Sequence, residues 1–374
     1  MDGNHVDWSR MPFEILCYIF QFFSYRDKLV FLSVCTQWQK AVGAPLFWKK
    51  IIVKIDRDLN EPSLLYLIQK YYMHIEILEI GWSVPYASRL KYPEMNYKEI
   101  VKRVGRFLIL FFERRIQLKH LVIANWYDIY QLRKLCYFLV RIIRHQTSLE
   151  SITLHNANLN EMNFSKILVL CTLTRHTINQ LNIHYSTFNA KRFFDWWVFT
   201  NCIEMFDNLT VLTIDCWIFL QFFYKLRVTL HKLELLNLYV ANTRKKCDGL
   251  IIVNQTDWEK FVICMPKTVV TLKMDNPMSD KRFERILQKH YPLVAFEWNY
   301  LFYNESCLKD CQQCLERLVK EQQNVLEKIR LNIPLERNQL QDIIDWIRKK
   351  CQKLQSFVFN NQDLLINETG FPSL

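Results

Sequence analysis

The sequence predicts an α/β protein in which a helical unit of residues 10–48 is followed by short parallel strands alternating with helices. Three observations lead to this prediction. A six-residue strand-like pattern recurs ten times after residue 74, and stretches with helical periodicity lie between the recurrences. The front segment lacks the pattern and carries apolar residues at helical contact spacing instead. A repeated strand and helix indicates a solenoid.

The recurring pattern is apolar-x-x-apolar-x-apolar. Its ten occurrences are IEILEI (75–80), LKHLVI (118–123), LESITL (149–154), INQLNI (178–183), LTVLTI (209–214), LELLNL (233–238), VVTLKM (269–274), LVAFEW (293–298), LEKIRL (326–331) and LQSFVF (354–359). One match is weak evidence in a chain that is 50 % hydrophobic. Ten matches whose starts are 24 to 43 residues apart are strong evidence, because that spacing leaves room for a helix in each repeat.

The segments between the cores fit the same scheme. Apolar residues recur at steps of three and four in EMNYKEIVKRVGRFLILFFERR (94–115) and YQLRKLCYFLVRIIRH (130–145), as in amphipathic helices. WKKIIVKID (48–56) predicts a first strand, and PSLLYLIQKYYM (62–73) a first helix. Asparagine, whose amide can satisfy backbone groups where a chain turns out of a strand, follows six cores as Asn125, Asn156, Asn276, Asn299, Asn332 and Asn361.

A strand and a helix repeated roughly every 30 residues resemble a leucine-rich-repeat solenoid. The resemblance implies a parallel sheet on the concave side and helices on the convex side. One such unit cannot bury its apolar face alone, so the repeats are expected to share one continuous core. We expect this solenoid over residues 51–374.

Residues 10–48 read as three short helices. Pro12 suits a first helical turn, and Glu14 lies near the positive end of the helix dipole. Ile15, Leu16 and the apolar residues after them form a stripe at helical spacing. Because so small a unit buries little surface, it needs a partner or a neighbouring domain. From the pattern alone, a helical cap on the solenoid is the alternative.

The motifs of this segment resemble an F-box over residues 10–50, with residues 1–9 as an N-terminal arm. Met11 to Leu16 occupy the positions of the family motif Leu-Pro-x-Glu-Ile/Leu-Leu, and Ile19-Phe20 match the Ile-Phe pair that follows it. Val34-Cys35 with Trp38 match the motif Val-Cys-x-x-Trp, and Pro45-Leu46-x-Trp48 match the closing Pro-x-Leu-Trp motif. Met11 and Phe23 replace the usual leucines. By resemblance, the residues that bind the Skp adaptor are Met11, Pro12, Glu14, Ile15, Leu16, Ile19, Phe20, Val34, Cys35, Trp38, Leu46 and Trp48.

An F-box followed by such repeats resembles the substrate receptors of SCF-type ubiquitin ligases. This resemblance implies a non-catalytic subunit that reaches a cullin-RING ligase through the Skp adaptor and holds a protein substrate on the repeats. Two alternatives stay open. One is an adaptor-bound scaffold with no role in ubiquitination, and the other is a basic solenoid that binds nucleic acid or an acidic partner.

The composition limits the chemistry and the partners. With 6 glycines, the chain has no phosphate-cradling loop, and we expect no catalytic residues and no cofactor. Cys307, Cys311 and Cys314 share one helical face without a nearby histidine, which favours core over metal. The formal net charge of +12 allows an acidic or phosphorylated partner, but the basic residues look dispersed and lack RNA-type aromatic interleaving.

The apolar runs are too short for a membrane span, and residues 1–8 lack signal-peptide features. We therefore expect a cytoplasmic or nuclear protein with reduced cysteines.

The position after each core predicts a row on the concave face, because strand side chains alternate. The row reads Gly81, Ala124, His155, His184, Asp215, Tyr239, Asp275, Asn299, Asn332 and Asn360. His155, His184, Asp215, Tyr239 and Asp275 are the predicted substrate-binding residues. An ordinary solvated polar row, or a metal site, would give the same pattern.

Overall fold

A computed structural model describes residues 10–23, 25–60, 62–83, 97–126, 132–157, 159, 161–184, 196–240, 253–274, 283, 287, 291–299, 307–333, 337–360 and 362–363. The chain divides into two compact units, Met1–Thr177 and Ile178–Leu374. The predicted arm of residues 1–9, together with Asp275, Asn276 and Asn361, lies outside the described residues.

The first unit begins with the helices predicted for the front segment, namely α1 (Phe13–Phe20), α2 (Tyr25–Phe31), α3 (Thr36–Val42) and the short η2 (Pro45–Phe47). An aromatic cluster holds them together. The ring of Phe20 stacks on Phe31 with centroids 4.7 Å apart and meets Trp38 edge-on at 5.2 Å. Large rings that meet in this way supply much of the apolar burial available to so small a unit.

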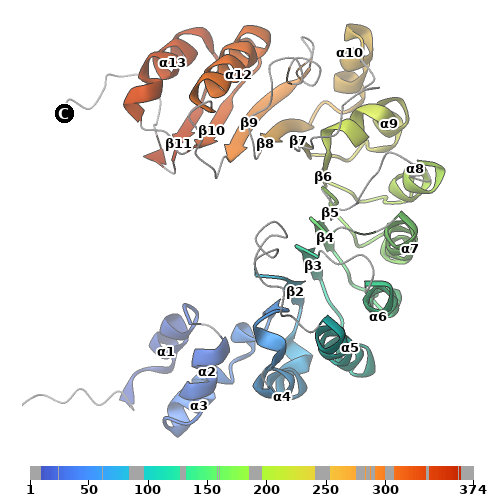
Figure 1. Cartoon of the computed structure of the whole chain (residues 1–374), viewed down its shortest axis with the longest axis vertical. Coiled ribbons are helices and arrows are strands. Elements are labelled where there is room, and N and C mark those ends of the chain that lie inside the picture. The colour runs from blue at the N-terminus through green and yellow to red at the C-terminus, as the bar shows by residue number, and fades with distance from the viewer. Residues whose placement is uncertain are drawn as a thin grey trace, which may run out of the picture. The chain divides into compact units, whose positions relative to one another are not determined.

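Four parallel strands with their connecting helices complete the first unit. The elements are β1 (Lys50–Lys54), η3 (Asp58–Asn60), α4 (Pro62–Tyr71), η4 (Tyr72–His74), β2 (Ile77–Gly81), α5 (Tyr97–Glu113), β3 (His120–Ala124), α6 (Leu132–Arg144), β4 (Ser151–His155), α7 (Glu161–Cys171) and η6 (Thr172–Thr174). Neighbouring strands pair in chain order, and Gly81, Ala124 and His155 share one row. The helices α4 to α7 cover one face of these strands (Figure 1).

The second unit continues the alternation. Its elements are β5 (Gln180–Asn182), α8 (Trp196–Glu204), β6 (Val211–Asp215), α9 (Cys216–Thr229), β7 (Leu235–Val240), α10 (Gln255–Cys264), β8 (Val269–Met274), β9 (Leu293–Asn299), α12 (Cys307–Gln322), β10 (Lys328–Asn332), α13 (Arg337–Lys350), β11 (Ser356–Phe359) and β12 (Gln362–Asp363). Strands β5 to β11 pair in parallel, and β12 runs antiparallel to β11. Here too the described helices lie on one face of the strands (Figure 1).

These strands confirm the predicted fold class. Each of the ten sequence cores contains a strand, and the segment 48–56 supplies β1 as predicted. Alternate residues point into the core, as Leu212 of β6 and Leu236 of β7 show by their complete burial. A helical front unit followed by repeated parallel strands with helices on one face is the arrangement of a leucine-rich-repeat-like solenoid.

The register predicted for β8 is wrong by two residues. Tyr239 of β7 pairs with Lys273, so the position beside Tyr239 belongs to Lys273 and not to Asp275. The apolar-x-x-apolar-x-apolar pattern matches VVTLKM only if Val269 is a buried position. In the structure Val269 is exposed and Val270 is buried. A six-residue stretch with few polar residues fits the template in more than one register, so the spacing alone could not fix it.

Asparagines mark the strand ends, as predicted. Asn125, Asn156 and Asn360 have positive φ angles of 53°, 51° and 46°, a region that asparagine enters more readily than most residues. The amide of Asn156 donates to Asn125 Oδ1, and the backbone N–H of Ile333 donates to Asn360 Oδ1. The Asn360 side chain thus replaces a backbone partner where the chain leaves the sheet, and the Asn125–Asn156 bond joins two neighbouring strand ends.

Candidate binding surfaces

The front unit exposes an apolar stripe on α1. Ile15 and Tyr18 are 47 % and 63 % exposed, and Phe22, just beyond the helix, is 71 % exposed. Their spacing of three and four residues places them on one side, while Leu16 and Phe20 are buried on the other. A helix that is apolar on both sides has one side for its own core and one for a partner.

The predicted adaptor-binding residues include an exposed group and a buried group, with four residues of intermediate exposure between them. Pro12, Glu14, Ile15, Val34 and Leu46 are exposed; Met11, Ile19, Cys35 and Trp38 are half-buried; and Leu16, Phe20 and Trp48 are buried. The buried three stabilise the front unit itself and cannot touch a partner without unfolding it. The motif spacing could not separate the two groups, because both recur with helical periodicity.

Several exposed apolar residues of the front unit were not among the predicted adaptor-binding residues. Phe13, Tyr18, Phe22, Phe23 and Val30 are all exposed in the front unit. So much exposed apolar surface on so few residues is unusual for a monomer and indicates a binding surface. The signal was present in the sequence, because α1 and the residues after it carry apolar side chains on nearly every helical face.

The front unit is joined to the repeats through Trp48. Its indole N–H donates to the Val42 carbonyl over 2.7 Å, and its ring stacks on Tyr71 at the end of α4, with centroids 4.2 Å apart and planes 5° from parallel. Trp48 is buried and lies two residues before the start of β1. One side chain therefore belongs to the front core and also contacts the first repeat, which fixes the junction within the first unit.

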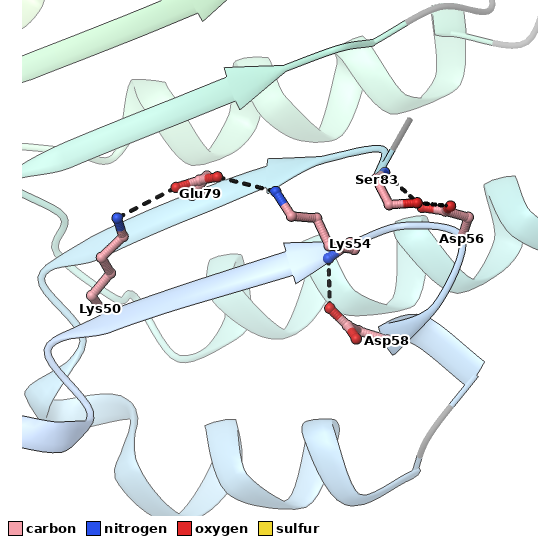
Figure 2. A network of polar contacts seen from close by, with 6 residues as sticks. All are labelled: Lys50, Lys54, Asp56, Asp58, Glu79 and Ser83. Atoms are coloured by element: carbon pink, nitrogen blue, oxygen red, sulfur yellow. Dashed lines mark hydrogen bonds and ion pairs between the residues drawn. The ribbon is translucent and has the colours of Figure 1, made fainter. Parts of the chain in front are cut away.

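Polar contacts on the first two strands reinforce that junction. Figure 2 shows the Glu79 carboxylate of β2 between the ammonium groups of Lys50 and Lys54 of β1, at 3.4 and 3.2 Å. Asp58 Oδ2 accepts a hydrogen bond from the Lys54 backbone N–H, and the Asp56 carboxylate accepts from the backbone N–H and the hydroxyl of Ser83. These partly exposed ion pairs individually contribute little, but together they fix β1 against β2.

The face of the strands opposite the helices carries part of the predicted substrate row. In the second unit Asp215 pairs in register with Tyr239, and the ring of His184 stacks on Tyr239 with centroids 3.9 Å apart. The Nδ1 atom of His184 lies 2.5 Å from Asn182 Oδ1. His184, Asp215 and Tyr239 therefore lie close together in the second unit, and their role in binding a substrate stays a prediction.

The expectation that this row is solvent-facing is wrong for two of its members. His184 and Asp215 are only 3 % and 4 % exposed, and Asn237 and Thr213 on the same face are also buried and joined by a 3.1 Å hydrogen bond. Buried polar groups of this kind hold their surroundings in one arrangement. Tyr239 is half-buried and is therefore the most accessible of the three side chains.

Charged residues that the sequence prediction missed continue the row beyond Tyr239. Lys273, Glu297 and Arg330 occupy successive register positions on β8, β9 and β10. The Lys273 ammonium lies 2.9 Å from Glu297, whereas Arg330 is exposed. The sequence prediction missed these residues because its register for β8 was wrong by two positions.

His155 of the first unit sits at the end of β4 and is half-buried. Burial lowers the pKa of His155 below its ordinary value of 6.5, because desolvation disfavours the charged imidazolium. The unfolded chain therefore binds this proton more readily than the folded chain. The stabilising contribution of neutral His155 is present above about pH 6.5 and is lost as the pH falls below it.

We expect acidification to destabilise the wild-type chain more than the His155→Gln variant. The glutamine cannot take up the proton that opposes folding at low pH. Urea unfolding of both proteins at a neutral and a mildly acidic pH measures the difference in free energy of unfolding. An equal loss in the two proteins would show that His155 does not contribute to the acid sensitivity.

Two buried thiols of the described residues, Cys136 and Cys202, are poor nucleophiles at neutral pH. Burial raises the pKa of Cys136 to about 12 and that of Cys202 to about 11. Both thiols stay protonated, whereas nucleophilic cysteines need a lowered pKa. Cys307, Cys311 and Cys314 all lie on α12, where Cys314 is buried, and the described residues contain no group of three or more metal-ligand side chains.

Among the described helices, none is both long and apolar enough to cross a membrane.

The geometry defines a helical docking unit attached to a repeat domain, and a comparison with protein families agrees. Residues 8–50 match the F-box domain. No curated protein matches the chain. The front unit is thus an F-box domain, which implies a Skp adaptor as partner, followed by repeated parallel strands.

Proposed function

We propose that the protein is the substrate-recognition subunit of an SCF-type ubiquitin ligase. The observation that carries the proposal is the exposed apolar surface of the F-box, with Ile15, Val34 and Leu46 among its solvent-facing residues. These three belong to the family motifs and are free to contact the Skp adaptor. The buried members of the motifs keep the F-box folded.

In this proposal the repeats hold a protein substrate on the face of the strands opposite the helices. In the second unit Tyr239 is half-buried, and Lys273, Glu297 and Arg330 add charge along the same face of that unit. In the first unit His155 is the half-buried polar residue of the predicted row. The ring of His184 stacks on Tyr239 and orients it, and the roles predicted for Asp215 and Asp275 stay predictions. The mixed charges favour a polar substrate segment.

The subunit would act through proximity and not through chemistry of its own. Holding a substrate near a ubiquitin-charged enzyme raises the effective concentration of the reacting groups. The stacked Trp48 supports this role, because it fixes the F-box to the first repeat, and the ion pairs of Glu79 hold the first two strands together. The partners are the Skp adaptor, through it the cullin-RING ligase, and the substrate, in the cytoplasm or nucleus.

Two measurements separate this proposal from its alternatives. Co-purification of the full chain with the Skp adaptor distinguishes an F-box protein from a solenoid that acts alone. Adaptor-dependent turnover of a bound protein then distinguishes a receptor from a scaffold. An adaptor complex whose bound proteins keep their lifetimes when the chain is deleted would favour the scaffold.

A further inference from the structure

Much of the positive charge of the chain lies in one stretch, which contains a pair of helices and the segment that connects them. Residues 97–145 contain 11 Lys or Arg and 3 Asp or Glu, a net charge of +8 against +12 for the whole chain. The helices α5 and α6 of this stretch lie side by side in the first unit (Figure 1). A Cβ on Gly105 would lie 3.2 Å from the Phe138 ring, which shows how closely they pack. The basic residues are thus less dispersed than the sequence suggested.

Three cations form a line along the exposed side of α5. Lys98, Lys102 and Arg106 follow one another at steps of four residues and are all exposed. Val104 and Phe107, which are buried, lie on the opposite side. Among the described residues no carboxylate lies within ion-pair distance of these three cations. Nearby Glu99 instead pairs with Arg103, at 3.1 Å.

Neither helix stability nor packing accounts for this line. Like charges four residues apart destabilise a helix. Lys98 lies in the first turn of α5, where the helix dipole disfavours a cation. By contrast, Arg144 lies at the C-terminal end of α6, where the dipole favours it. An anionic partner would relieve the repulsion along α5.

An arginine on α6 extends the basic surface. The Arg141 guanidinium lies 4.2 Å over the Phe112 ring and 5.5 Å from the Tyr137 ring centre. Stacking of this kind orients the guanidinium, whose planar fork matches a carboxylate. One face of each ring is thus engaged by the guanidinium.

We propose that this basic surface, formed by Lys98, Lys102, Arg106 and Arg141, binds an acidic helical segment of a partner protein. Carboxylates four residues apart on a helix recur about every 6 Å, which is the spacing of the cations along α5. The surface lies on the helical side of the first unit, away from the substrate row of the strands (Figure 1). The proposal therefore goes beyond the proposed function and does not depend on it.

The test uses the full chain and a fluorescein-labelled alanine-based helical peptide with glutamate at every fourth position. Fluorescence anisotropy compares the wild type with Lys98→Glu/Lys102→Glu/Arg106→Glu. The matched control is Lys349→Glu/Lys350→Glu/Lys353→Glu, which reverses three exposed lysines of the second unit. We expect affinity to fall about tenfold or more in the first variant and less than about twofold in the control.

Equal losses in both variants would overturn the proposal, because net charge alone would then explain binding. Absence of peptide binding by the wild type would also overturn the proposal. So would a DNA duplex or phosphatidylserine vesicles that bind the wild type more tightly than the peptide does and are weakened by the same α5 substitutions. If the charge-reversal variant of α5 does not fold, the variant with glutamine at the same three positions takes its place. Unchanged capture of the Skp adaptor by every variant keeps this test separate from that of the F-box.

Discussion

Serine in place of Ile15, Val34 and Leu46 together is expected to weaken binding of the Skp adaptor at least about 100-fold. All three side chains are exposed in the F-box, so their removal takes apolar anchors from the interface without opening a cavity in the core. Buried Leu16 is unsuitable for this test, because Leu16→Ala would destabilise the F-box itself. The measurement is a titration of the full chain with purified adaptor.

The chain offers a control of the same composition. Ile263, Val169 and Leu173 are exposed apolar residues outside the F-box. Serine at these three positions removes the same side chains from other surfaces, and adaptor affinity should stay within about twofold of the wild type. Equal weakening by the two variants, or none in the F-box variant, would contradict the assignment of this surface to the adaptor.

Leu236→Asp is expected to unfold the second unit. Leu236 is completely buried in β7 and pairs with Leu212 on one side and Val270 on the other. Loss of a buried leucine costs about 2 to 5 kcal/mol, and burial of an unpaired carboxylate adds several more. The sum is comparable to the whole stability of a typical domain, about 5 to 15 kcal/mol.

Circular dichroism and thermal unfolding measure this effect, with Leu236→Met as the control. Methionine nearly conserves the volume and should cost less than about 1.5 kcal/mol. If the aspartate variant melts like the wild type, Leu236 is not in the core and the strand register is incorrect.

The strands and the F-box could be predicted from the sequence because both depend on local patterns. Alternation within six residues defines a strand, and its recurrence with intervening helices defines the repeat. The asparagines at 125 and 156 signalled the strand ends because few other residues accept that backbone conformation. At this level sequence and structure agree.

The binding surfaces were harder to predict because they depend on contacts distant in sequence. Alternation shows that His184 and Asp215 lie on the face opposite Leu212, but not that this face is closed over them. Helical spacing marks both Ile15 and Leu16 as apolar contact positions, although one is exposed and the other buried. In β8 the register followed the burial of Val270, which the apolar template did not distinguish from that of Val269.

The most direct test of the proposed receptor role is proximity labelling in cells that express either the intact chain or the variant with serine at 15, 34 and 46. The variant keeps the repeats and should lose the adaptor, so bound substrates would no longer be ubiquitinated. We predict a set of proteins that both chains label. In cells that express the variant, these proteins should be more abundant and carry less ubiquitin than in cells that express the intact chain. Identical abundance and ubiquitination of all labelled proteins beside the two chains would contradict the role of substrate receptor.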